Sequence, residues 1–260
     1  MSQDLSALNK QAIASAKGYM GQVAWPTVLL VAAVLPGYAL NLALFASGVF
    51  PVWVALPCLG ALTYLSYTPL HEAVHGNIHG TNEGLRWLND LCGYLMAPLI
   101  AIPCASHRYE HLTHHRFTNQ PGKASSKDRV IYCLELFFSL SWRVAFVSAV
   151  VHSGAASLLE AVGVIVLGYL LGGYFTAYWF AYRPHIPYQD AKGYRNTSSL
   201  IMPTWMKPLE WFWLGQNLHS IHHLFPRVPF YKYHALHRDI EPIMRAQGAP
   251  IIGAFNRKPL

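Results

Sequence analysis

The stretch GALTYLSYTPLHEAVH, residues 60–75, ends an apolar segment in two histidines that are four residues apart. Residues 18–70 contain no Asp, Glu, Lys or Arg. Because about 20 apolar residues in a helix cross the hydrocarbon core of a bilayer, a segment of this length can cross it twice. We expect a transmembrane hairpin, with one span near residues 27–47, a short turn at residues 48–51 and a second span near residues 52–70.

The composition of the whole chain agrees with a membrane protein. Apolar residues make up 53% of the 260 residues and charged residues only 12%, whereas charged residues are about 25% of an ordinary globular domain. The four cysteines stand singly in largely apolar sequence, so neither disulfide bonds nor a cysteine zinc site is expected. The N-terminal residues lack the apolar run and cleavage site of a secretory signal, and we interpret residues 1–20 as an uncleaved cytosolic arm.

A second apolar block covers residues 131–182 and is long enough for one interfacial helix and another hairpin. Four polar residues interrupt it, namely Glu135, Arg143, His152 and Glu160. We predict the interfacial helix at residues 129–142, a third span at residues 143–158 and a fourth span at residues 161–182, with Pro184 and Pro187 marking the exit. Between the hairpins, residues 85–103 are apolar but include Arg86 and Asp90, which favours a partly inserted or interfacial helix over a full crossing.

These elements predict an all-α integral membrane protein with two transmembrane helical hairpins, about four spans, interfacial helices and a cytosolic histidine-rich cap. We expect residues 1–260 to form a single domain: the arm, a first hairpin (27–70), a segment with two histidine groups (71–129), a second hairpin (143–182) and a tail with a third histidine group (183–260). Four crossings place both termini and every polar loop on one side.

The net charge of +7 arises mostly outside the apolar runs, and the positive-inside rule therefore assigns that side to the cytosol of a multi-pass membrane protein, here a bacterial inner-membrane protein. The basic residues on that side have two possible explanations: membrane topology alone, or the attraction of an acidic redox partner.

Ten of the fourteen histidines lie in three short windows, residues 71–79, 107–115 and 219–223. Within these windows the histidines recur three and four residues apart, which places them on one face of a helix. Eight of them fit this spacing: His71, His75, His111, His114, His115, His219, His222 and His223. Eight imidazoles are too many for one tetrahedral ion, so the sequence predicts two metal ions.

Ligand type alone leaves the metal open, because imidazole suits iron, zinc, copper and nickel. His71-Glu72-Ala-Val-His75 is an HExxH match and raises the alternative of a membrane zinc protease, but that reading leaves the two HxxHH groups unexplained. A histidine-rich metal transporter is a second alternative. Transporters place polar ligands within their spans, whereas these clusters lie outside the long apolar runs.

The order HxxxH, HxxHH and HxxHH, separated by apolar spans, resembles the membrane fatty-acid desaturase and hydroxylase superfamily, which includes carotenoid hydroxylases. The resemblance covers residues 70–229 and the span before them. The resemblance extends beyond the histidines to the residues around them. The three extended boxes are His71-Glu-Ala-Val-His75-Gly, His111-Leu-Thr-His114-His115-Arg-Phe-Thr-Asn119 and Gly215-Gln-Asn-Leu-His219-Ser-Ile-His222-His223-Leu-Phe-Pro226. The third is most similar to bacterial carotene-hydroxylase-type and acyl-desaturase sequences.

The resemblance implies an O2-dependent oxidoreductase with two iron ions, cycling between Fe2+ and Fe3+ and held by the eight box histidines. It also implies a ninth ligand near the end of the fourth span, for which His185 is the candidate. O2 would be the co-substrate and a long lipophilic molecule in an apolar tunnel the substrate. A carotenoid hydroxylase, which is a monooxygenase, is preferred to an acyl-lipid or fatty-acid desaturase.

The chain has no cytochrome-like His-Pro-Gly-Gly segment, flavin fingerprint or ferredoxin cysteine cluster. A separate electron donor, such as a ferredoxin or a cytochrome, is therefore expected in addition to the bilayer and the substrate, and no nucleic-acid partner is expected.

The remaining polar residues receive lesser roles. His79, His107 and His152 are not needed as ligands, and His234 and His237 are expected in solvent. Glu72 and Glu110 adjoin ligands and can orient an imidazole through its other nitrogen. Trp205, Trp211 and Trp213 suit the membrane interface.

Overall fold

A computed structural model of the chain describes residues 4–117, 126–185 and 193–256. The α-helices are α1 (Leu5–Lys17), α2 (Trp25–Ala46), α3 (Val52–Val74), α4 (Arg86–Ile100), α5 (Cys104–Phe117), α6 (Ser126–His152), α7 (Leu158–Thr176), α8 (Arg183–His185), α9 (His219–Leu224) and α10 (Tyr233–Ala246). Strands β1 (Ser199–Ile201) and β2 (Ile251–Gly253) form a short parallel sheet. The all-α membrane fold is confirmed. Asn119 of the second box and Pro187 lie outside the described residues.

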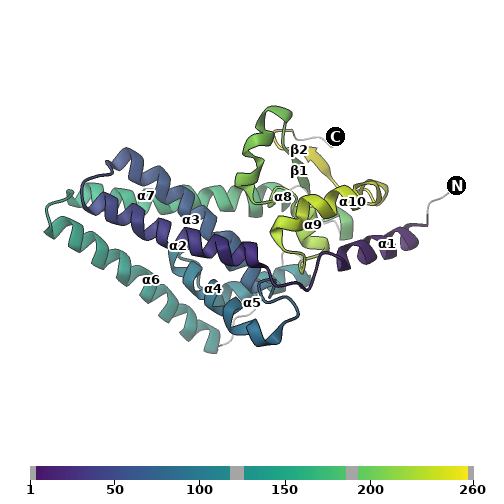
Figure 1. Ribbon diagram of the computed structural model, residues 1–260, viewed down its shortest axis with the longest axis horizontal. Coiled ribbons are helices and arrows are strands. Elements are labelled where there is room, and N and C mark those ends of the chain that lie inside the picture. The colour runs from purple at the N-terminus through teal and green to yellow at the C-terminus, as the bar shows by residue number, and fades with distance from the viewer. Residues whose placement is uncertain (1–3, 118–125, 186–192, 257–260) are drawn as a thin grey trace.

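The first predicted hairpin is formed by α2 and α3, which lie side by side (Figure 1). The turn between them contains Gly48 at φ 74°, a left-handed conformation that glycine adopts without steric cost. Helix α3 continues through residue 74, four residues beyond the expected end of its span. The first histidine box therefore begins inside the last turn of a long, buried helix.

Within the described residues, three segments are long and apolar enough to cross a membrane: Trp25–Ala46, Arg129–His152 and Leu158–His185. The pair Glu83–Ile100 and Cys104–Arg116, bent by 99°, would add a fourth if it formed one span. Helix α3 is not among them, because its second half is rich in Thr, Ser and Tyr and is packed between α2, α4 and α7. A helix enclosed by other helices does not need an apolar surface all round.

The prediction for the start of the second hairpin was wrong. Helix α6 runs without a break from residue 126 to 152, where a separate interfacial helix (129–142) and a span (143–158) were expected. The chain then turns through Gly154 at φ 73°, and α7 begins at residue 158. Ser157 and Glu160 form a capping box there, which satisfies the first free N–H groups of α7.

Arg143 does not end the span because the protein satisfies its guanidinium group. Its Nη1 donates to the Ser139 carbonyl at 2.7 Å, and its Nη2 donates to the Leu99 carbonyl at 3.1 Å. The guanidinium carbon also lies 4.5 Å from the centre of the Trp142 ring. Since Leu99 is in the last turn of α4, Arg143 fixes the end of that helix, where the chain bends toward α5.

The end of α7 changes its helical geometry. Residues Ala177–Tyr182 form a π-helical segment, and the short helix α8 follows directly. π-Helical turns are rare and occur mostly at functional sites. This segment lies in the predicted fourth span and leads the chain to His185.

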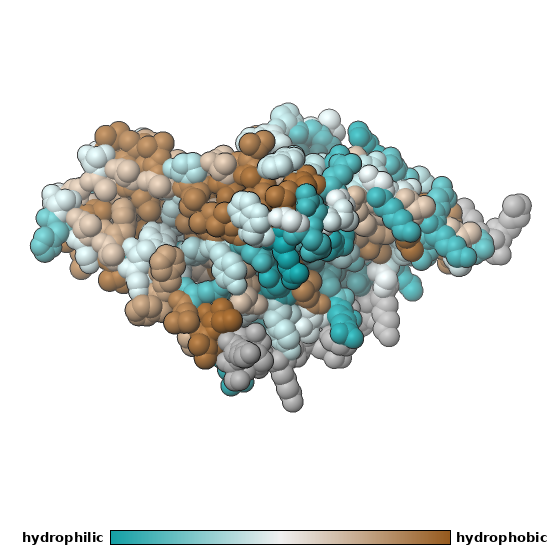
Figure 2. Space-filling view, turned by 60° about the horizontal axis from the view of Figure 1, so that its bottom comes forward, coloured by the Kyte–Doolittle hydropathy of each residue, from teal (hydrophilic) through white to brown (hydrophobic). Residues whose placement is uncertain are grey.

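The last third of the chain covers the end of the bundle opposite the two hairpin turns (Figure 1). Helix α10 packs against α1 and α9, and Ala12 and Ala16 of α1 enter a hydrophobic core with Leu236 and Ile240 of α10. Figure 2 shows hydrophobic side chains mostly over the helical bundle, at the left, and hydrophilic ones mostly over the last third of the chain, at the right. The predicted histidine-rich tail is therefore a folded cap on the helical bundle.

Candidate metal centre

The first box lies at the end of α3. His71 is in the last turn, and His75 is the C-cap residue, so their rings lie one above the other with centroids 4.9 Å apart. Gly76, at φ 68°, ends the helix in the left-handed conformation. The helix therefore presents both imidazoles at its end, and both are buried.

The second box lies on α5, directly after the bend. His111 and His115 are one turn apart on the face toward α3 and α9, and their Nε2 atoms are 3.1 Å apart. His114 points elsewhere: its ring centroid lies 4.8 Å from that of His185 and 5.1 Å from that of His223. The three histidines of this box therefore point toward two neighbouring groups of imidazoles.

The third box forms the short helix α9, which is fixed by the segment before it. Asn217 donates its Nδ2 hydrogen to the Leu200 carbonyl at 3.0 Å, and the Leu200 N–H donates to the Asn217 carbonyl at 2.6 Å. These bonds tie α9 to β1. His219 and His222 are consequently buried although the helix has only six residues.

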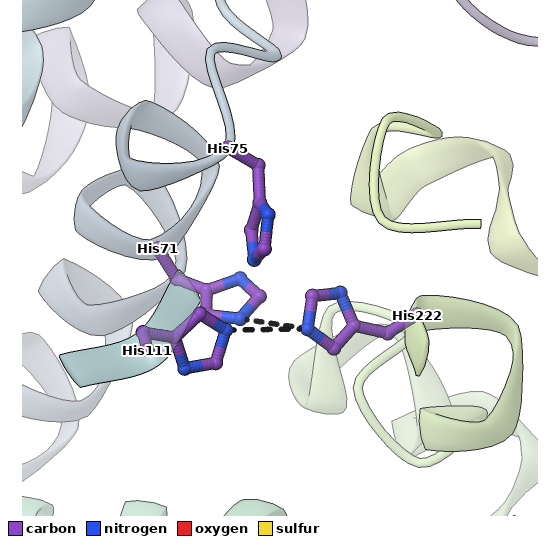
Figure 3. A group of neighbouring side chains, drawn as sticks. All are labelled: His71, His75, His111 and His222. Atoms are coloured by element: carbon purple, nitrogen blue, oxygen red, sulfur yellow. Dashed lines mark hydrogen bonds between the residues drawn. The ribbon is translucent and has the colours of Figure 1, made fainter. Parts of the chain in front are cut away.

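Four imidazoles from three elements meet at one point (Figure 3). The nearest ring nitrogens of His71, His75, His111 and His222 all lie within 4.8 Å of one another. The Nε2 atom of His222 is 3.1 Å from that of His71, 3.4 Å from that of His111 and 2.7 Å from that of His115. An imidazole nitrogen is either one donor or one acceptor, so it cannot satisfy three neighbours by hydrogen bonds.

A shared cation would resolve this crowding. Because imidazole nitrogens bind a transition metal at about 2.0–2.1 Å, two nitrogens that share one ion lie within about 4 Å of each other, as those around His222 do. The donor set therefore fits a transition metal, which neutral imidazole binds well.

A second group adjoins the first. His114, His185 and His223 offer nitrogens within 4.8 Å of one another, and the group of His115, His222 and His223 connects the two clusters. The Nε2 atom of His219 lies 3.0 Å from that of His185. The structure thus brings all eight box histidines and His185 together in one connected cluster.

Unsatisfied nitrogens support the same reading. Among the described residues of the cluster, His75 and His223 have a buried Nε2 atom without a hydrogen-bond partner. An unpaired buried polar atom costs about 1–3 kcal/mol. Burial, and then the neighbouring imidazoles, hold the pKa of His219, His222 and His223 well below the usual 6.5. These rings are neutral at pH 7, the form that binds a metal.

The model of the fatty acid desaturase family matches residues 47–130 and 122–255, which include every histidine of the cluster. The chain belongs to the fatty acid desaturase family. No curated protein matches it. Members of the desaturase family are O2-dependent oxidoreductases with a di-iron centre, act on lipids and lie in membranes. Family membership excludes the zinc protease and the metal transporter as the class of this chain.

Around the cluster, this desaturase-family chain supplies contacts that the sequence did not predict. The Tyr233 hydroxyl lies 3.1 Å from His222 Nδ1, and both groups are buried. With Nε2 of His222 unprotonated, Nδ1–H donates to the tyrosine oxygen and fixes the ring orientation. Tyr233 is the first residue of α10, eleven positions after His222, and no pattern in the third box indicates it.

The two predicted orienting carboxylates of this family member are placed differently from expectation. Glu72 is fully buried, but its partner is the amide of Asn77, at 3.3 Å from Oε1, rather than a box histidine. Asn77 also donates to the Pro226 carbonyl at 3.0 Å, so Glu72 stiffens the connection between the first box and the segment after α9. Glu110 is exposed.

The other histidines of the desaturase chain stand outside the metal groups. His107 packs against Tyr67 and the ring of His111, and His79 lies 3.8 Å from the carboxylate of Glu83. His152 is exposed at the end of α6, far along the chain from the boxes.

Two expectations about exposure were wrong. His237 is buried, 3.8 Å from the carboxylate of Glu241, on a helix that packs against α1 and α9, whereas His234 is exposed as expected. Trp213 is buried in a core with Phe180 and Met206, while Trp205 and Trp211 are exposed.

Proposed function

We propose that this chain is a membrane di-iron oxygenase whose two iron ions are bound by nine histidines. The ligands would be His71, His75, His111, His114, His115, His185, His219, His222 and His223. The observation that supports this most is the convergence of nine imidazoles from α3, α5, α8 and α9 on one cluster. When bound, the iron centre would use O2 and external electrons to oxidise a C–H bond.

The substrate would lie in an apolar cavity beside this cluster. A cavity of about 470 Å³ is lined by α7, the π-helical segment, the α4–α5 bend and residues of α3 and α5. Tyr67 and His107 line its wall. The ring centroid of Tyr67 lies 5.5 Å from that of His71, and the ring centroid of His107 lies 5.3 Å from that of His111. The protein would hold the lipophilic chain there, exclude water and present one carbon to the metal end.

Within this class, we prefer a carotenoid hydroxylase of the β-carotene type to an acyl-lipid desaturase. The preference rests on the resemblance of the third box to bacterial carotene-hydroxylase-type sequences. The apolar cavity suits both substrates, because each has a long hydrocarbon chain. The two reactions differ in their product: insertion of oxygen gives an alcohol, and removal of a second hydrogen gives a double bond.

Electrons would come from a separate ferredoxin or cytochrome that docks on the cap. We also propose that the cap and both termini face the cytosol of a bacterium, following the positive-inside rule. The cap has exposed basic side chains such as Arg195 and Arg238, which suit an acidic donor.

The function can be tested by expression in a host that makes β-carotene, with analysis of carotenoids and fatty acids. An oxygenated carotenoid supports the preferred substrate, and a new acyl double bond supports the alternative. His222→Ala should abolish the product and lower the iron content, whereas His234→Ala, at an exposed position, should change neither. Purified protein without iron, with no O2-dependent product, would contradict the proposal.

A further inference from the structure

Two adjacent glycines of α7, Gly172 and Gly173, have opposite surroundings. A Cβ atom on Gly172 would lie 2.4 Å from the Gly60 carbonyl oxygen and 2.8 Å from the Thr63 Cβ, so this glycine permits the close approach of α7 to α3. A Cβ atom on Gly173 would have nothing within 4 Å. Close packing explains the first glycine and leaves the second unexplained.

The space beside Gly173 is the cavity described above. Gly173 lines it together with Tyr169, Leu170 and Tyr174 of the same helix. The volume of about 470 Å³ is in the range of small-molecule sites, about 300–1,000 Å³. A side chain at position 173 would therefore occupy space that is open to a ligand.

Gly173 lies in the part of the cavity that is remote from the metal cluster. Twelve positions of continuous helix separate it from His185, six of them in the π-helical segment, so it lies about three turns from that histidine. Ala177, Phe180 and Ala181 line the cavity between these points. A chain whose reacting carbon is at the histidines would pass these residues before reaching Gly173.

We propose that Gly173 determines how far the apolar chain of the substrate extends from the metal centre, and so selects substrates by length. This inference rests on the proposed function, because it places the oxidised carbon at the histidine cluster. The absence of a side chain at position 173 admits long chains, and a bulky side chain there would exclude them. Both candidate substrates have such a chain.

The first test measures binding rather than turnover. A homologous series of straight-chain fatty acids is titrated into the purified full-length protein, and the increase in its unfolding temperature is followed. Gly173→Leu should leave the shortest chains unaffected and should weaken binding of the longest, by about fourfold for each methylene that no longer fits. Gly173→Ala should give a smaller shift in the same direction.

Gly163→Leu is the matched control. Gly163 lies in the same helix and has nothing within 4 Å of an added Cβ atom, but it does not line the cavity. Because leucine favours a helix more than glycine does, both leucine variants should fold. Gly163→Leu should bind the series like the unmodified protein.

Three results would overturn the inference: an unchanged length profile in Gly173→Leu, an equal shift in Gly163→Leu, or no length dependence in the unmodified protein. A second measurement, the length distribution of oxidised products, should shift as the binding profile does. If the unmodified protein binds long chains with the expected dependence on residue 173 but oxidises none, the proposed function fails and the length selection remains.

Discussion

The Nε2 atoms of His185 and His219 lie 3.0 Å apart, although 34 positions separate the two residues. His185 ends the helical segment that leaves the second hairpin, and His219 begins the short helix of the third box. This contact joins the bundle to the cap at the cluster itself, and position 185 is therefore a sensitive place to test the proposed ligand set.

Replacing His185 by Ala should remove one imidazole from the second group without disturbing the first. We expect activity to fall by at least about 10–100-fold, the range found when even an indirect partner of a metal ligand is lost. Iron content and turnover of the purified variant measure this. His152→Ala, at an exposed position, is the control. Full activity in His185→Ala would remove His185 from the ligand set.

Replacing Tyr233 by Phe should keep the packing of the ring and remove only the hydroxyl that faces His222 Nδ1. Since such partners orient ligands, iron affinity or activity should fall by about 10–100-fold. Iron retention during dialysis against a chelator measures the effect. Tyr231→Phe, two positions earlier and only half-buried, should behave like the unmodified protein. Equal loss in both variants would contradict the role of Tyr233.

The stability of the metal-free protein should depend on pH through the buried histidines of the cap. The pKa of His219, His222 and His223 is lowered by burial in the folded chain, whereas the unfolded chain titrates near 6.5. Below about pH 6.5 the unfolded state therefore binds more protons, so stability is fully present above that pH and falls toward the lowered values.

Each such histidine should reduce the free energy of unfolding by about 1.4 kcal/mol per pH unit in that window. Thermal unfolding in detergent between about pH 8 and pH 5 measures the slope, and His222→Gln should make it shallower. A melting temperature that does not change with pH would contradict the expectation.

Replacing Arg143 by Leu should destabilise the bend between α4 and α5. The change removes the donor to the buried Leu99 carbonyl and should cost about 1–3 kcal/mol of unfolding free energy. Thermal unfolding in detergent checks the loss. Val144→Ala, at the next and exposed position of α6, should cost much less. A variant as stable as the unmodified protein would show that the bend does not need Arg143.

Local patterns were enough to predict much of the molecule. The spacing of His71 and His75, and the two HxxHH groups, predicted which imidazoles share a face because one helical turn decides it. The uncharged segment likewise predicted the helical hairpin of α2 and α3, although α3 is not among the segments apolar enough to cross a membrane. His185 was expected because the family resemblance implies a ninth ligand near the end of the fourth span, and it does lie in the cluster.

What the sequence did not predict depends on partners far along the chain. Helix α6 continues through Arg143 because the guanidinium group donates to the Leu99 carbonyl. This acceptor is 44 positions away in the sequence. Tyr233 reaches His222 only because the chain after α9 folds back over the cluster. His237 is buried on α10, which packs against α1 from the other end of the sequence. No local window contains these contacts.

The brevity of α9 has a consequence for how the molecule is made. A helix of six residues is well below the length of about 12–15 residues at which isolated helices become even marginally stable in water. It therefore depends on β1 and α10, which lie on either side of it in the sequence. If its three histidines bind iron as proposed, insertion of the hairpins and loading of the metal are separate events in biogenesis. A nascent chain would enter the membrane first and acquire iron only after α10 has been synthesised and has docked.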